Sequence, residues 1–120
     1  MGKKITLVED DKDASLMIHK LLSDAGFDVD TFNEGTPLIE KNYPPPDMFI
    51  LDNFMPTIHG IALCKFLKLK KETREIPVII ISANKQLKNK AEEAGATFFL
   101  GKPFHSYELL KFVNDVLEEP

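Results

Sequence analysis

The chain has 120 residues, a net charge of −4 and a pI of about 5.3, with 43% hydrophobic and 28% charged residues. This length and balance predict one globular domain over residues 1–120, and the acidic charge argues against direct nucleic-acid binding by it. The apolar runs are too short for a membrane span or signal peptide, and the single cysteine, Cys64, excludes an internal disulfide, so we expect a cytoplasmic protein without membrane contact.

Short apolar runs alternate with longer amphipathic ones along the whole chain. In chain order they predict a strand at 5–8, a helix at 13–25, a strand at 27–32, a helix at 35–42, a strand at 48–51, a helix at 61–69, a strand at 78–81, a helix at 86–94, a strand at 97–100 and a helix at 107–117. Five such β-α units predict an α/β fold, in which helices cover both faces of a five-stranded parallel sheet.

Chemically useful side chains follow four of these strands. Glu9 and Asp10 follow the first strand, Asp52 the third, Ser82 the fourth, and Lys102 lies just after the fifth. Because ligands of open α/β sheets bind beyond the carboxyl ends of the strands, we expect these groups to converge on one edge.

Three neighbouring carboxylates need a compensating cation, and an all-oxygen site that keeps open positions suits Mg²⁺. The metal would let an anionic phosphodonor approach Asp52 as the nucleophile, while Lys102 and Ser82 contact phosphoryl oxygens. The competing interpretation is structural, since acidic residues after a strand often cap the next helix. We expect one of Asp10, Asp11 or Asp13 to do so.

The pattern resembles the receiver domains of two-component response regulators, and the resemblance covers essentially the whole chain. It rests on the segments Leu7-Val8-Glu9-Asp10-Asp11, Ile50-Leu51-Asp52 with Met55-Pro56 and Gly60, Ile80-Ile81-Ser82-Ala83, and Lys102-Pro103-Phe104. It implies a flavodoxin-like receiver fold with strand order 2-1-3-4-5.

The resemblance also implies a role for each matching position. Asp52 is the expected phosphoacceptor, Lys102 the phosphate-contacting lysine, with a cis bond to Pro103, and Ser82 and Phe99 the switch residues. The implied Mg²⁺ ligands are Glu9, Asp10, Asp52 and the backbone carbonyl of Phe54.

The resemblance further implies the partners and the output. A sensor histidine kinase or phosphotransfer protein would supply the phosphoryl group, and the face formed by the fourth helix, fifth strand and fifth helix would change shape for a downstream protein or output domain. The segment 95–99 lacks the paired acids of salt-bridged dimers, so we expect a monomer or weak dimer. The protein would be a signalling switch that catalyses only its own phosphorylation and dephosphorylation.

Several positions depart from the usual receiver pattern. Glu9 replaces the commoner Asp, and His59 stands where Asp usually precedes Gly60. The flanking residues Asn53 and Asn84 make the lifetime of the acyl phosphate an open question. The alternative from another functional class is a receiver-like binding module regulated without phosphorylation, but such modules usually lose an acid or the lysine, and this chain keeps both.

Overall fold

The structure is a computed structural model that describes residues 2–40, 43–54 and 58–117. Strands and helices alternate along the chain, as the sequence predicts. They are β1 (Lys4–Val8), α1 (Lys12–Asp24), β2 (Asp28–Phe32), α2 (Thr36–Glu40), β3 (Met48–Asp52), α3 (Gly60–Leu69), β4 (Val78–Ser82), the 3₁₀ turn η1 (Lys85–Leu87), α4 (Lys88–Glu93), β5 (Phe98–Gly101) and α5 (Ser106–Leu117).

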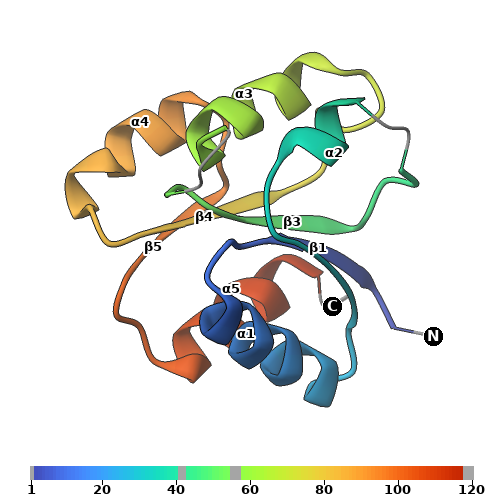
Figure 1. Cartoon of the computed structure of the whole chain (residues 1–120), viewed down its shortest axis with the longest axis vertical. Helices are drawn as coiled ribbons and strands as arrows, with labels where there is room; N and C mark the ends of the chain where they lie inside the picture. Colours follow the sequence, from blue (N-terminus) through green and yellow to red (C-terminus); the bar gives the residue numbers. More distant parts are fainter. Residues whose placement is uncertain (1, 41–42, 55–57, 118–120) are drawn as a thin grey trace.

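The strands form one parallel sheet in the order β2-β1-β3-β4-β5, which confirms the predicted order. The helices α2, α3 and α4 cover one face of the sheet, and α1 and α5 cover the other (Figure 1). Every residue of β3 and β4 is buried, as expected for strands covered on both sides.

Alternate residues of each central strand point into two separate hydrophobic cores, one on each face of the sheet. Ile50 and Ile79 point into the core beneath α1 and α5, while Leu51 and Ile80 point into the core beneath α2, α3 and α4. Cys64 is fully buried in the second core, as a small apolar side chain of α3.

Local chemistry fixes both ends of α1. The carboxylate of Asp11 accepts a hydrogen bond from the Ala14 backbone N–H at 2.8 Å, which confirms that one of the three acids caps this helix. Gly26, which follows the last turn, has φ +100°, a left-handed conformation that glycine adopts without strain.

Some element boundaries differ from the predictions. The segment predicted as one helix at 86–94 begins as a 3₁₀ turn, because the Asn84 side chain accepts from the Gln86 N–H and tightens the first turn. In β2, Val29 is buried but Thr31 is exposed, since this strand lies at the edge of the sheet. Within the described residues, no helix has the length and apolar character needed to cross a membrane.

Candidate functional site

Three carboxylates meet at the carboxyl edge of the sheet. Glu9 and Asp10 follow β1, and Asp52 ends β3, its hydrogen-bonded neighbour. Each offers one oxygen, and these oxygens all lie within 4.8 Å of one another. Glu9 and Asp52 are only 2% and 3% exposed, whereas Asp10 is open to solvent. The convergence predicted from the strand ends is therefore present.

The Lys102 side chain reaches these carboxylates from the loop after β5. Its Nζ lies 3.1 Å from Asp52 Oδ1 and 3.4 Å from Glu9 Oε1. The lysine side chain is 30% exposed and the two carboxylates that it contacts are almost fully buried, while Asp10 beside them is open to solvent. The cluster has a net negative charge, which favours binding of a further cation.

Burial changes the protonation of this cluster. It raises the pKa values of Glu9 and Asp52 above those of ordinary carboxyl groups, although Lys102 opposes the rise in both cases. Burial alone lowers the pKa of Lys102, but its contacts with Asp52 and Glu9 outweigh that effect, and the pKa is raised overall. Lys102 therefore stays protonated at neutral pH.

Ser82 ends β4 with its side chain 4% exposed. Its Oγ accepts a hydrogen bond from the Asn84 backbone N–H at 3.0 Å, which leaves the hydroxyl hydrogen free for another acceptor. Its carbonyl accepts from the Lys102 backbone N–H at 2.9 Å. This backbone bond holds the β4 and β5 ends together and places the hydroxyl and the ammonium on the same edge.

The loop after β3 is held by Asn53, a role that the sequence did not reveal. Its Oδ1 accepts from the Ile61 N–H at 3.0 Å, and its carbonyl accepts from the Gly60 N–H at 3.2 Å. His59, at the N-terminal cap position of α3, makes no side-chain capping bond; its Nδ1 lies 3.0 Å from the Asn53 carbonyl instead.

Gly60 has a steric reason to be glycine. A Cβ at this position would lie 2.7 Å from the Asp52 carbonyl oxygen, closer than real Cβ atoms approach. The first turn of α3 therefore packs directly against the backbone of the third carboxylate. The Met55-Pro56 part of the predicted motif lies outside the described residues.

Phe54 lies next to the acidic cluster. Its side chain is 80% exposed, and its backbone lies close enough to the Asp52 carboxylate to oppose the rise that burial causes in the pKa of Asp52.

The two phenylalanines of β5 point to opposite faces of the sheet. Phe98 stacks on Phe112 of α5, with ring centroids 4.4 Å apart. Phe99 is half-buried and packs against the core beneath α4, on the same side as Ala91. The Lys102–Pro103 bond is cis, as predicted.

The donor set fits Mg²⁺. It consists of carboxylate oxygens at one water-accessible edge, the hard oxygen ligands that Mg²⁺ prefers, with Asp10 exposed to solvent so that the metal can keep waters. Among the described residues, these three acids are the one group of His, Cys, Asp or Glu side chains placed to share a metal ion.

Comparisons with known proteins find similarity to response regulators. The sequence profile of the response regulator receiver domain matches residues 5–114. The phosphate regulon transcriptional regulatory protein PhoB of Rhizobium meliloti is 33% identical over 120 residues, covering 98% of this chain and 53% of PhoB. The chain thus spans about half the length of the curated relatives it matches.

Solved structures agree with the sequence matches. Response regulator DrrB of Thermotoga maritima, an OmpR/PhoB homologue, has a TM-score of 0.86 and 29% identity, over 98% of this chain and 54% of DrrB. Response regulator TrrA of Thermotoga maritima, solved in complex with Mg²⁺ and BeF, has a TM-score of 0.83 and 27% identity, over 96% of this chain and 99% of TrrA.

Proposed function

The chain belongs to the family of two-component response regulator receiver domains, and from that premise we propose that residues 1–120 form one receiver whose phosphoacceptor is Asp52. The observation that carries this proposal is the position of Lys102, whose Nζ contacts both Asp52 and Glu9 within a cluster of three carboxylates. A phosphoryl group on Asp52 would bind the Lys102 ammonium in place of the Asp52 and Glu9 carboxylates.

The proposed reaction is transfer of a phosphoryl group from a phosphohistidine. An Asp52 oxygen attacks phosphorus, a new P–O bond forms, and the P–N bond to the donor imidazole breaks. Lys102 offers its ammonium to a phosphoryl oxygen, and Ser82 offers its hydroxyl hydrogen to another. Mg²⁺, when bound, offsets the negative charge of the acids and of the incoming group.

The metal would be held by Glu9, Asp10, Asp52 and the backbone carbonyl of Phe54. The side-chain ligands are already gathered, so metal binding needs no rearrangement of the strands that carry them. With these residues the protein would catalyse only its own phosphorylation and dephosphorylation, and would otherwise act as a signalling switch.

The proposed switch begins at Ser82. When its hydroxyl turns toward the phosphoryl group, space opens beside it, and the half-buried ring of Phe99 moves inward. The surface of α4, β5 and α5 then presents a different shape to a downstream protein or output domain. The phosphodonor would be a sensor histidine kinase or a phosphotransfer protein, and the receiver itself would be a monomer or weak dimer in the cytoplasm.

Amide NMR spectra with Mg²⁺ and then beryllium fluoride test this proposal. We expect Mg²⁺ to shift the amides of Asp10 and Asn53, and beryllium fluoride, which mimics the phosphoryl group, to shift those of Ser82 and Phe99. Asp52→Asn is the matched control and should lose the fluoride response. A wild-type spectrum that beryllium fluoride leaves unchanged in the presence of Mg²⁺ would overturn the proposal.

A further inference from the structure

A cavity of about 420 Å³ lies far from the acidic cluster, at the amino ends of β1 and β3 beneath the short helix α2. The lengths of the elements explain it. The five described residues of α2 rise about 7.5 Å, whereas a five-residue strand extends about 16 Å, so these five residues do not cover the sheet to its amino edge. The volume is within the range of small-molecule sites.

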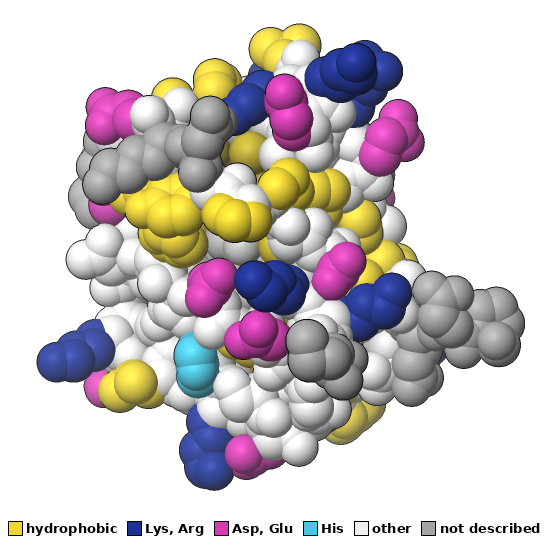
Figure 2. Space-filling view, turned by 90° about the vertical axis from the view of Figure 1, so that its right-hand side faces the viewer, with side chains coloured by type: hydrophobic (Ala, Val, Ile, Leu, Met, Phe, Trp, Pro, Cys, Tyr) yellow, Lys and Arg dark blue, Asp and Glu magenta, His cyan; other side chains and the backbone are white. Residues whose placement is uncertain are grey.

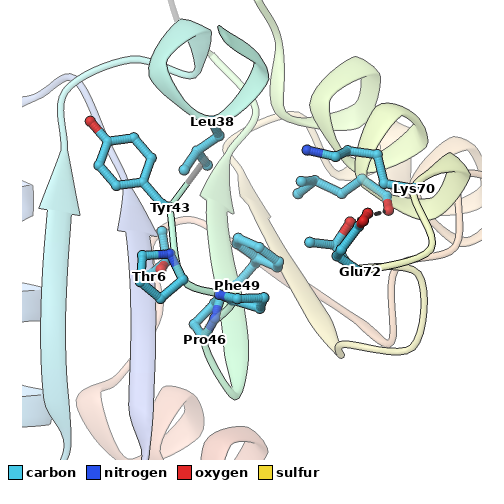
Figure 3. A pocket seen from close by; sticks show the side chains of 11 residues that line it. Thr6, Leu38, Tyr43, Pro46, Phe49, Lys70 and Glu72 are labelled. Carbon is cyan, nitrogen blue, oxygen red and sulfur yellow. Dashed lines mark hydrogen bonds between the residues drawn. The ribbon is translucent and has the colours of Figure 1, made fainter. Parts of the chain in front are cut away.

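The wall of the cavity is apolar and rich in rings. Leu38 of α2, Phe49 of β3 and Leu67 of α3 form one side, and the segment from Tyr43 to Pro46 lies against them (Figure 3). Figure 2, seen from the amino ends of the strands, shows hydrophobic side chains gathered in its upper half, on the side of the sheet that α2 and α3 cover.

The floor of the cavity holds the hydroxyl group of Thr6, a residue that is buried as a whole. Thr6 of β1 pairs with Phe49 of β3, and its side chain points to the same side of the sheet. Thr6 is only 6% exposed, yet its hydroxyl has no hydrogen-bond partner within residues 2–40, 43–54 and 58–117. By contrast, the nearby Thr73 hydroxyl donates to the Leu67 carbonyl at 2.6 Å. Among the described residues every fully buried side-chain N or O atom has a partner, so this unpartnered hydroxyl is open to the cavity, where a polar ligand atom can hydrogen-bond to it.

One cation faces the cavity. Lys70, at the end of α3, extends its ammonium toward α2 (Figure 3), 5.5 Å from the centre of the Phe66 ring. It has no ion-pair partner in the described part of the chain and is half-buried, whereas the other charged residue of the lining, Glu72, is exposed. Lys70 can therefore neutralise a negative charge on a ligand in this cavity.

We propose that this cavity binds a small aromatic carboxylate that also carries a hydroxyl group. The ring would lie against Phe49 and the prolines, the carboxylate would pair with Lys70, and the ligand hydroxyl would bond to Thr6. The site is independent of the phosphoacceptor, since none of its lining residues belongs to the acidic cluster.

The test uses 6-hydroxy-2-naphthoate as the probe and 2-naphthoate as its matched partner without the hydroxyl. We expect saturable shifts of the Thr6, Phe49 and Thr73 amides in NMR titrations of the metal-free protein, with a Kd of about 1 mM or below. Lys70→Met should weaken both probes about five-fold. Lys71→Met, an exposed lysine outside the lining, should leave both unchanged.

Thr6→Val preserves shape and removes the hydroxyl. It should weaken the hydroxylated probe about three- to ten-fold and leave 2-naphthoate unaffected. Lys70→Met changes only a partly exposed side chain, so we expect this variant to fold. Its affinity for the two probes therefore still tests the proposal if Thr6→Val fails to fold. The proposal is overturned if neither probe gives saturable shifts at the three amides, or if Lys70→Met binds both probes as tightly as the wild type.

Discussion

Replacing Asp52 by asparagine is expected to stabilise the metal-free protein. Burial raises the Asp52 pKa in the folded state, so the fold disfavours the ionised carboxylate. Above the unfolded pKa, this carboxylate lowers the free energy of unfolding, and the neutral amide removes that cost. The difference between variant and wild type should shrink as the pH falls through the raised pKa, because the wild-type carboxyl then becomes neutral as well.

The distances give the size of the effect. Asp52 lies within 4.8 Å of both Glu9 and Asp10, so at an effective dielectric of about 20 each repels it by at least about 3.5 kcal/mol. Lys102 at 3.1 Å attracts it by about 5.4 kcal/mol at the same dielectric. The net repulsion is about 1.6 kcal/mol before solvent screens the exposed Asp10 and before burial adds its own cost. We therefore expect a gain of about 1–2 kcal/mol, or about 4–8 °C in Tm for 120 residues.

Urea unfolding at pH 7.5 in a chelating buffer measures this gain. Asp24→Asn is the matched control, because Asp24 forms an exposed pair with Lys20 at 2.9 Å and its loss should change stability by less than about 0.5 kcal/mol. Excess Mg²⁺ should narrow the gap between Asp52→Asn and wild type, since the metal binds the full set of carboxylates better. A variant less stable than the wild type in chelator would refute the reasoning, because attraction by Lys102 would then outweigh both repulsions.

Three further predictions concern the same edge of the sheet. Mg²⁺ affinity should fall as the pH is lowered, because protons compete with the metal for the carboxylates of Glu9 and Asp52. Since the pKa values of both groups are raised, the fall should begin at a higher pH than it would for ordinary carboxyl groups. Calorimetric titrations between pH 5 and 8 measure the affinity, and an affinity that does not change with pH would contradict this prediction. Lys102→Met should lower the metal-free free energy of unfolding by about 1–2 kcal/mol, because two buried carboxylates lose their cation, and urea unfolding that shows no loss would count against it. Gly60→Ala should lower the free energy of unfolding by about 1–3 kcal/mol, because the new Cβ would clash with the Asp52 carbonyl oxygen. Ala62→Ser on the same helix serves as the control, and equal free energies of unfolding for the two variants would exclude the clash.

The sheet and most of the site were predictable because they depend on periodicity and strand ends. Uninterrupted apolar runs such as that in β4 predict a strand covered on both faces, and β-α alternation predicts parallel strands whose ends share one edge. The sequence alone therefore predicts that Asp52, Ser82 and Lys102 lie together.

What the sequence did not predict depends on individual hydrogen bonds and on element lengths. Asn53 holds the loop after β3 through its side chain and carbonyl, and nothing in its position distinguishes it from an ordinary loop asparagine. Asn84 turns the start of the fourth helix into a 3₁₀ turn by a bond that only the local geometry permits. The cavity above Thr6 lies beneath the short helix α2, and the length of a helix in a weakly patterned segment is difficult to predict from sequence.

The most direct test of the central claim is the intact mass of the protein after incubation with a small phosphodonor and Mg²⁺. The account predicts the mass gain of one phosphoryl group on the wild type, absent from Asp52→Asn and absent when a chelator removes the metal. A wild type that gains no mass under conditions that phosphorylate a control receiver would contradict Asp52 as the acceptor, and would favour a receiver-like binding module regulated without phosphorylation.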